Sequence, residues 1–502
     1  MVILQSINVP NILIFLGIAA ILIFIKARLF RLSNKALAIF TLFTIFIAGM
    51  VWISEPYLPN FFSGDFQMGL SSDIARATDN VFYAVEPGAT FISLLVLLMV
   101  FLVLLFSAEY LEKEQRQHTF YPLVLFMIIG VLGMLWAADL LIIYLFSELM
   151  NISAYTLVAF RRKNNTAIEA GFKYLIMSSV ASVIVLSGIG VLFYTQGTTR
   201  IALISIGQDW ISQIGAIFIL SGFSLKSALV PLHTWLPDAH GKAPSSISAL
   251  LSGVMIQSVF YTMLRTCLAI GMDPVFMGNI LLILSILNII VGNLMGIIQK
   301  NLKRMLGYST IAQMGYIVLC FSIGLRNDSA LAFQSGFFIL TTHALTKGLA
   351  FLSAGTFYYY DGVEWIKDIR NIADHPFFTF IAMSAAIFSL SAIPPFPGFT
   401  GKWTALTSVF AASDPIVAWI TLAILVGSLL AFGYYLPLLV NLSNRFIGTR
   451  SKTDSNTSLK ESPWINISMA LFLLAILMLI GFPQMILDNT FFAAKYLLEL
   501  VK

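Results

Sequence analysis

Cysteine and charge are both scarce in this chain. Only Cys267 and Cys320 occur among its 502 residues, which excludes a disulfide framework and an iron–sulfur cluster with four cysteine ligands. Charged residues make up 11% of the sequence, against roughly 25% in an ordinary soluble domain. Hydrophobic residues make up 59%. This composition predicts an all-α polytopic membrane protein with no separate soluble domain.

Sequence motifs for cofactor chemistry are also lacking. We find no CxxCH, no GxGxxG after a strand, no phosphate-binding P-loop, and no HExxH or other histidine spacing typical of a zinc site. We therefore expect no cofactor, no metal and no active-site chemistry on this chain itself.

Apolar runs near the roughly 20 residues needed to cross a bilayer recur from Asn11 to Phe482. They predict fourteen membrane-spanning helices, at about 11–30, 36–54, 88–107, 121–137, 139–159, 171–194, 211–232, 245–265, 277–298, 306–324, 331–357, 376–411, 416–438 and 463–482.

The distribution of Lys and Arg supports this count, because these residues gather in cytoplasmic loops. When alternate loops are assigned to the two sides, nineteen Lys and Arg residues lie on one side and six on the other, together with both termini. We therefore predict a multi-pass protein of the cell (inner) membrane with both termini on the non-cytoplasmic side. The net charge of +5 then reflects topology, so no nucleic-acid partner is expected.

Proline and glycine interrupt two helical runs, LKSALVPLHTWLPDAHGKAP (225–244) and SAIPPFPGFTGKW (391–403). Such breaks are tolerated in a membrane where the freed backbone groups line a cavity, and paired breaks indicate transporter repeats. They fall in the seventh and twelfth spans, so the two broken helices run in opposite directions. We predict two inverted five-helix repeats, and hence four regions: helices 1–3 (1–110), a first unit (111–270), a second unit (271–440), and a loop, last helix and tail (441–502).

Five charged residues lie inside predicted spans: Glu148, Lys173, Lys226, Lys347 and Lys402. A charge at bilayer depth costs roughly 2.5–3.5 kcal/mol on insertion scales, so such residues usually serve ion or proton transport. Glu148 could accept a proton or hold a lysine charged, or it could be a neutral acid bonded to a neighbouring helix. Lys226 lies one turn before Pro231 and could pair with Glu148. For both Lys226 and Lys402 the alternative is a lysine that reaches the membrane surface.

Histidines accompany these charges. His343 lies four residues before Lys347 and hence on the same helix face, where it could relay protons or simply be buried and hydrogen-bonded. His233 and His240 flank the first break and could act in translocation or lie at the membrane surface. Lys173 follows a glutamate by four residues at the start of a span, which fits a surface ion pair as well as a functional role.

Four segments, in order, resemble one superfamily: PLHTWLPDAHGKAPSSISALLSG (231–253), NLKRMLGYSTIAQMGY (301–316), HALTKGLAFLSAG (343–355) and PPFPGFTGK (394–402). From about residue 90 to 440 the chain resembles the antiporter-like subunits of respiratory complex I, the Mrp cation/proton antiporter subunits and the large membrane subunits of energy-converting hydrogenases. The first segment is most similar to hydrogenase and sulfane-reductase-type members, whereas SELMNISAY and IEAGFKYLIMSS also resemble complex I subunits.

The resemblance implies two inverted five-helix units, each with a half-channel, and a row of charged residues along the membrane midplane. In this superfamily the fifth helix supplies a glutamate, matched by Glu148, and the seventh a lysine, matched by Lys226. The eleventh helix supplies a histidine or lysine, matched by His343 and Lys347, and the twelfth a lysine or glutamate, matched by Lys402.

One position departs from that pattern. The eighth helix commonly carries a lysine where this chain has Gln257, in LSGVMIQSVFYT. A neutral amide can hydrogen-bond water but cannot bind and release a proton near pH 7. An unbroken relay of lysines between the two halves is therefore not assured.

These features favour a subunit that translocates H⁺ or Na⁺ in a multisubunit respiratory redox complex, of the complex I, membrane-bound hydrogenase or sulfane reductase type. Electron transfer elsewhere in the complex would drive the ion. The alternative is a subunit of a Mrp-type Na⁺/H⁺ antiporter, and an inert scaffold would leave the buried charges unexplained. The expected partners are other membrane subunits, the ion and the lipid bilayer.

Overall fold

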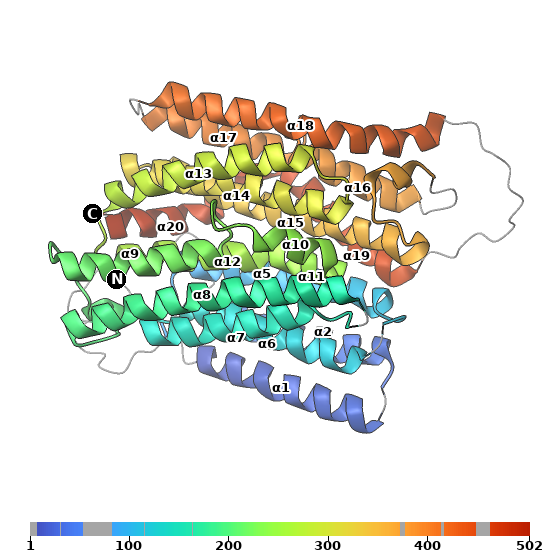
Figure 1. Ribbon diagram of the computed structural model, residues 1–502, viewed down its shortest axis with the longest axis horizontal. Helices are drawn as coiled ribbons and strands as arrows, with labels where there is room; N and C mark the ends of the chain where they lie inside the picture. Colours follow the sequence, from blue (N-terminus) through green and yellow to red (C-terminus); the bar gives the residue numbers. More distant parts are fainter. Residues whose placement is uncertain are drawn as a thin grey trace, which may run out of the picture.

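The computed structural model describes residues 8–30, 32–53, 83–114, 116–162, 164–371, 377–412, 416–447 and 462–501. Within these ranges the chain is helical, apart from connecting segments and three isolated β-bridges. The long helices run side by side, and α1 begins at the end of the bundle at which α20 finishes (Figure 1). The predicted all-α fold is confirmed.

The helices follow in chain order. They are α1 (Asn8–Phe30), α2 (Asn34–Ile53), α5 (Pro87–Tyr110), α6 (Gln117–Trp136), α7 (Leu140–Val158), α8 (Asn165–Gln196), η1 (Ile201–Leu203), α9 (Trp210–Lys226), α10 (Trp235–Lys242), α11 (Ser245–Leu250), η2 (Leu251–Met255), α12 (Ile256–Ala269), α13 (Pro274–Ile297), α14 (Leu302–Asn327), α15 (Ala330–Asp361), η3 (Ile366–Asn371), α16 (Phe377–Leu390), α17 (Pro397–Ala412), α18 (Val417–Ile447), α19 (Pro463–Gly481) and α20 (Pro483–Val501).

Twelve helices in the described ranges are long and apolar enough to cross a membrane. Two shorter apolar helices, Trp210–Lys226 and Phe378–Leu390, are the first halves of the two broken helices. Together these account for the fourteen predicted spans. The run 376–411, predicted as one span, contains two helices, α16 and α17, because the proline-rich segment between them cannot continue a helix.

Polar caps define where the membrane helices begin. At the start of several helices, the side chain of an Asp, Asn or Ser accepts a hydrogen bond from the backbone N–H of the residue two or three positions later. These caps are Asp139 for α7, Asn164 for α8, Asp209 for α9, Asp273 for α13, Asn301 for α14 and Ser329 for α15.

The two breaks share one backbone geometry. Ala228 has a φ of 55° and donates its N–H to the Leu225 carbonyl (3.0 Å). Ala392, 164 positions later, has a φ of 57° and donates to the Ser389 carbonyl (2.9 Å). In both breaks the residue after the alanine donates its N–H to the carbonyl five positions earlier: Leu229 donates to Ser224, and Ile393 donates to Phe388. The same local structure thus recurs in the two halves of the chain.

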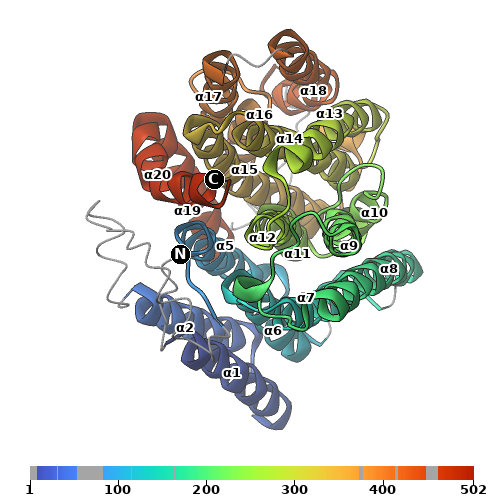
Figure 2. The same cartoon turned by 90° about the vertical axis from the view of Figure 1, so that its left-hand side faces the viewer.

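The long helices that precede the two broken helices repeat as well. Both α8 and α15 contain 32 residues, and each is followed by a glycine in the left-handed region, Gly197 (φ 71°) and Gly362 (φ 67°). They run in opposite directions in Figure 1. Figure 2 looks along the helices and shows α6–α9 on one side of the central α12 and α15, and α13, α14 and α16–α18 on the other. The predicted inverted repeat is therefore confirmed.

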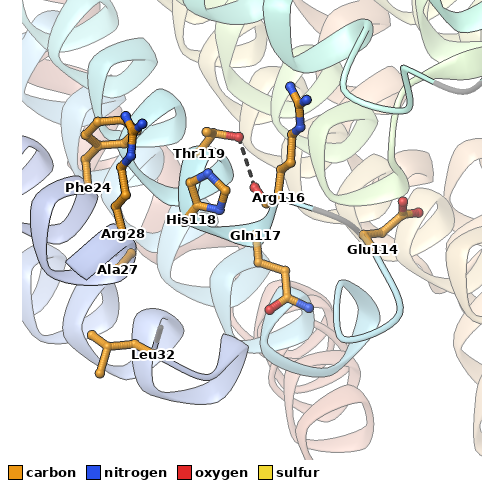
Figure 3. A pocket seen from close by; sticks show the side chains of 9 residues that line it. All are labelled: Phe24, Ala27, Arg28, Leu32, Glu114, Arg116, Gln117, His118 and Thr119. Atoms are coloured by element: carbon orange, nitrogen blue, oxygen red, sulfur yellow. Dashed lines mark hydrogen bonds between the residues drawn. The ribbon is translucent and has the colours of Figure 1, made fainter. Parts of the chain in front are cut away.

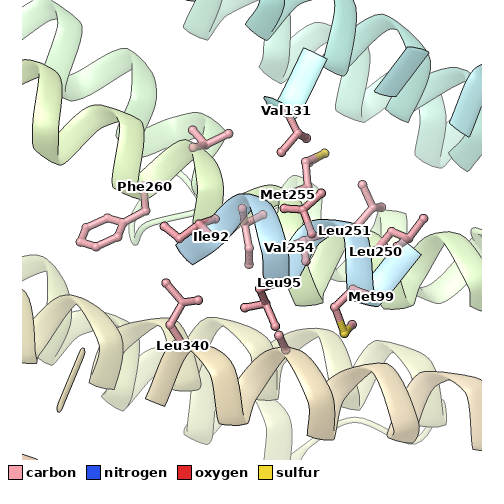
Figure 4. Packing of buried hydrophobic residues seen from close by; sticks show 14 of the residues in the cluster. Ile92, Leu95, Met99, Val131, Leu250, Leu251, Val254, Met255, Phe260 and Leu340 are labelled. Atoms are coloured by element: carbon pink, nitrogen blue, oxygen red, sulfur yellow. The ribbon is translucent and has the colours of Figure 1, made fainter. Parts of the chain in front are cut away.

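The centre of the bundle is closely packed. Helices α11 and α12 are joined by one π-helical turn, η2, which contains Gly253. A Cβ atom at Gly253 would lie 2.6 Å from the Met99 methyl group of α5 and 3.3 Å from the Ala344 carbonyl of α15, so a larger residue fits here only if these neighbours shift. Figure 4 shows Met99, Val254 and Leu340 in the same packed region. π turns of this kind are frequent at functional sites.

The segment after residue 482, predicted as a tail, forms α20, which packs against α15 and α5. The Gln334 side chain of α15 donates to the Leu487 carbonyl (2.9 Å). The buried face of α20 repeats every three or four residues, at Thr490, Ala493, Ala494 and Leu497. The helix was missed because its average hydropathy is low while its amphipathic pattern is clear.

Candidate functional site

A buried ion pair joins α7 to α9. Lys226 Nζ lies 2.7 Å from Glu148 Oε1 and donates a second hydrogen bond to Ser147 Oγ (3.0 Å). The Ser182 hydroxyl of α8 also donates to the Glu148 carboxylate. The Lys226 side chain is 1% exposed and that of Glu148 is 27% exposed, on the outer flank of the bundle. The predicted pairing of these two residues is present, and Lys226 does not reach the membrane surface.

The first break is held by side chains that satisfy its free backbone groups. Lys226 is the last residue of α9. The carbonyl before it, that of Leu225, accepts from Trp235 Nε1 (3.1 Å), and the Val230 N–H donates to Asn288 Oδ1 (2.6 Å). Because no lipid could supply these partners, the break is possible only inside the protein. This arrangement fixes Lys226 at the point where the helix ends.

Lys347 is the next buried cation along the bundle. It is the eighteenth of the 32 residues of α15 and is 0% exposed. Its Nζ donates to the Leu306 carbonyl (2.8 Å) and to Ser309 Oγ (2.6 Å), both on α14. Ser309 is in turn hydrogen-bonded to Tyr435 of α18. Within the described part of the chain Lys347 has no carboxylate partner, so its surroundings are polar but neutral.

His343 lies one turn before Lys347 on the same face of α15. Its Nε2 is 3.5 Å from Ser252 Oγ of the π turn, and Ser252 is 2.8 Å from the hydroxyl of Thr310. The ring is 2% exposed and its Nδ1 has no partner among the described residues. The predicted placement of His343 and Lys347 on one helix face is therefore correct, and both face the interior.

Lys402 lies on α17 just after the second break. Its Nζ donates to Ser428 Oγ of α18 (3.0 Å) and lies 4.2 Å from the centre of the Tyr316 ring. A cavity of about 10 Å³, enough for about one water molecule, lies between Lys402 and His343. Gln313, Ile339, Thr342, Thr346, Ser389, Leu390 and Gly398 complete its lining.

Other buried polar atoms lie along the same row. His240 is 0% exposed and stacks on Phe351, and neither ring nitrogen has a protein partner in the described chain. The predicted alternative of a surface position for His240 is thus wrong, because α10 packs inward against α14. Both amide atoms of Gln257, which is 1% exposed, are also without a partner there. Buried polar atoms of this kind usually bind ordered water.

The two remaining predicted positions lie apart from the row. His233 is partly exposed and meets the Tyr308 ring edge-on, at 6.4 Å between centroids. Lys173 is half exposed and pairs with Glu169 (2.8 Å) and Asp238 (3.2 Å). The geometry of Lys173 is that of a surface ion pair.

Several residues of the site were not singled out from the sequence. Asn151 lies one turn after Glu148, and its Oδ1 accepts from the Tyr174 hydroxyl (3.3 Å), which is 3.7 Å from the sulfur of Met255. These contacts lead from α7, one turn beyond Glu148, to the π turn η2, whose last residue lies two positions before Gln257. Ser182 was missed because hydroxyl residues are common in membrane helices and usually bond to their own backbone, so their sequence positions carry no distinctive signal.

The bundle, its inverted repeat and its row of buried charges define a class, the antiporter-like membrane proteins. The chain belongs to the family described as NADH:quinone oxidoreductase/Mrp antiporter, TM, whose model matches residues 137–430. The NADH-quinone oxidoreductase subunit N of Herminiimonas arsenicoxydans is 31% identical over 392 residues, which are 74% of this chain and 77% of that protein.

Solved structures share the fold over nearly the whole chain. A chain of the membrane-bound sulfane sulfur reductase (MBS), an archaeal respiratory membrane complex, superposes with a TM-score of 0.83 at 21% identity and covers 98% of both chains. A chain of the Mrp complex from Dietzia sp. DQ12-45-1b gives a TM-score of 0.82 at 19% identity, over 99% of this chain and 100% of that one. Both expectations of the resemblance, the superfamily and the fold, are confirmed.

Proposed function

We propose that this chain translocates H⁺ or Na⁺ across the cell membrane as one subunit of a multisubunit respiratory redox complex. The observation that carries the proposal is the row of buried polar groups from Glu148 on the flank of α7 to Lys402 on α17. A buried charge at this depth is costly, and each member of the row lies in the protein interior or at its edge. Packing alone gives no reason to retain such residues.

The proposed mechanism is electrostatic. The Glu148 carboxylate balances the charge of Lys226 at 2.7 Å. When Glu148 is neutralised or its partner changes, the Lys226 charge loses this balance, and its proton moves toward His343 and Lys347. Lys347 is held by neutral oxygens only, so it can take part in charge transfer without breaking a second ion pair.

Water carries the proposed relay across the positions that have no titratable side chain. The amide of Gln257 and the ring of His240 have polar atoms without protein partners, and water bridges such atoms at little energetic cost. The small cavity between His343 and Lys402 would hold the water for the last transfer of the relay. The ion would then leave the protein through the second unit.

Partner subunits and orientation complete the proposal. The related NADH-quinone oxidoreductase subunit and the MBS and Mrp chains belong to multisubunit membrane assemblies. By analogy, we assign electron transfer to other subunits and place the Lys- and Arg-rich end of this chain in the cytoplasm, with both termini on the opposite side.

Reconstitution of the purified complex tests this function. The complex is placed in vesicles, the redox reaction is driven from outside, and internal pH and Na⁺ are followed with ion-selective dyes. Lys347→Met should lower ion uptake roughly tenfold or more, since positioned proton-transfer groups contribute typically about 10²–10⁴-fold. Lys173→Met, which removes a surface charge, serves as the control. Normal uptake by an assembled Lys347→Met complex would contradict the proposal.

The second candidate is a Mrp-type Na⁺/H⁺ antiporter subunit, which the fold shared with the Dietzia Mrp chain favours. The two candidates differ in their partners. Co-purification of iron–sulfur or nickel proteins supports the redox complex, whereas small membrane partners alone, with Na⁺/H⁺ exchange in the absence of any redox reaction, support the antiporter.

A further inference from the structure

A cavity of about 720 Å³ opens between the end of α1 and the start of α6, away from the polar row. Arg28 and Arg116 flank His118 in this cavity, and their guanidinium groups point the same way in Figure 3. Phe24, Ala27, Leu32, Glu114, Gln117 and Thr119 complete the lining. The cavity lies at the Lys- and Arg-rich end of the bundle.

The charge of this cavity is positive. Arg28 and Arg116 are both exposed, and neither forms an ion pair with any residue that the structure describes. The carboxylate in the lining, Glu114, is already paired with Arg161 at 2.6 Å. A third guanidinium, that of Arg162, lies at the adjoining groove and is equally exposed. The cavity thus offers cationic donors to an anion.

The adjoining groove is apolar. It has a volume of about 340 Å³ and shares Phe24, Arg116 and Thr119 with the cavity. It is lined mainly by hydrophobic residues of α1 and α6, namely Ala20, Ile21, Pro122, Leu123 and Phe126, with Phe160. Ala20 precedes Arg28 by eight residues on α1, so at about 1.5 Å per residue the groove extends roughly 12 Å along the helix from the level of the arginine. With Arg28 at the headgroup level, the far end of the groove would lie at the depth of the acyl chains.

We propose that the cavity and groove together bind one anionic glycerophospholipid. Its phosphate lies between Arg28 and Arg116, because guanidinium groups bind phosphate through paired charge-assisted hydrogen bonds. One acyl chain lies along the groove against Ile21 and Phe126. A free phosphate ion would use only the charged cavity, and an apolar protein segment without a carboxylate would use only the groove. An anionic lipid carries the phosphate and the acyl chain in one molecule and so matches both parts.

Native mass spectrometry of the intact complex tests this site with added phosphatidylglycerol, phosphatidylcholine or inorganic phosphate. We expect wild type to bind phosphatidylglycerol in preference to phosphatidylcholine. Arg28→Gln with Arg116→Gln should weaken phosphatidylglycerol binding roughly tenfold. Lys300→Gln with Lys367→Gln removes two exposed charges from the same end of the bundle and should leave binding unchanged.

A groove variant separates the lipid from other ligands. Ile21 is 52% exposed, so Ile21→Trp fills the groove without disturbing the core and should weaken the binding of both lipids while both arginines remain. Three results would overturn the proposal: unchanged phosphatidylglycerol binding in both the arginine and the Ile21→Trp variants, inorganic phosphate that binds as tightly as the lipid, or a photo-crosslinker at position 21 that captures a neighbouring subunit instead of lipid.

Discussion

At the scale of single residues, the buried lysines differ in what balances them. Lys226 faces a carboxylate, whereas Lys347 and Lys402 bond to hydroxyl and carbonyl oxygens only. A change at Glu148 therefore acts first on Lys226 and reaches the other lysines through the neutral groups between them. In the proposed mechanism, Glu148 therefore holds the input position of the row.

Glu148→Gln keeps the size of the side chain and its hydrogen bond from Ser182, but it removes the negative charge beside Lys226. We expect the complex to assemble and ion pumping to fall roughly tenfold or more. Assembly is checked by native gel electrophoresis and pumping by dye quenching in vesicles. Normal pumping in the assembled variant would exclude Glu148 as a proton acceptor.

Lys226→Met and Lys402→Met should each strongly reduce translocation, because both lysines are buried and joined to the row. Lys173→Met should have a mild effect, since Lys173 is half exposed and pairs only with surface carboxylates. Pumping rates are compared at equal electron-transfer rate. Equal losses of pumping in all three variants would show that burial does not separate the lysines that act in translocation from those that do not.

Gln257 tests the proposed role of water. Gln257→Leu should slow translocation by about threefold or more, because an apolar side chain offers water no hydrogen-bond partner. Gln257→Lys should be tolerated better than Gln257→Leu, since related subunits place a lysine on this helix. If Gln257→Leu pumps at the wild-type rate, the ion takes a route that avoids α12.

At the scale of elements, each half of the chain has one broken helix, and a buried lysine of the site lies close to each break. Both breaks hold an alanine at positive φ, where an L-residue other than glycine, Asn or Asp is disfavoured. The lysines, however, lie at different places relative to them. Lys226 precedes its break, whereas Lys402 follows its break on α17, at the position that Asp238 occupies in the first unit. The two halves thus repeat the same backbone structure, but their charged side chains lie at different positions.

Ala228→Gly and Ala392→Gly should be less destabilising than Ala354→Gly, a buried control two turns from the end of α15, by about 1–2 kcal/mol each. Glycine relieves the positive φ at the breaks, whereas in the helix it only adds conformational freedom and removes a methyl group. Thermal unfolding midpoints of the purified complex give the ranking. A break variant as unstable as the control would contradict this account of the backbone.

The sequence predicted these elements unevenly. Proline and glycine located both breaks, and charge at bilayer depth identified Glu148 and Lys226, because each has a strong local signal. Asn288, which holds the first break from α13, and Tyr174, which leads toward α12, have no such signal. Their roles depend on contacts between helices distant in sequence, and only the packed fold brings them together.

At the scale of the whole molecule, the row crosses both units from the α7 flank to α17, so each unit supplies only part of a pathway. The partly exposed Glu148 ends the row on the outer flank. A neighbouring subunit that packs there would change the surroundings of Glu148 directly. Under the proposed function, the chain would receive a signal from the side and move an ion across the membrane.

Membrane orientation can be tested with single cysteines. Cys267 and Cys320 are buried and 0% exposed, so the native thiols give little background. Lys300→Cys lies at the Lys- and Arg-rich end, and Gln208→Cys lies in an exposed loop at the opposite end. We expect a membrane-impermeant maleimide added to intact spheroplasts to label Gln208→Cys and not Lys300→Cys, because positive loops remain in the cytoplasm. Labelling of Lys300→Cys alone would reverse the orientation and, with it, the side to which the row releases its ion.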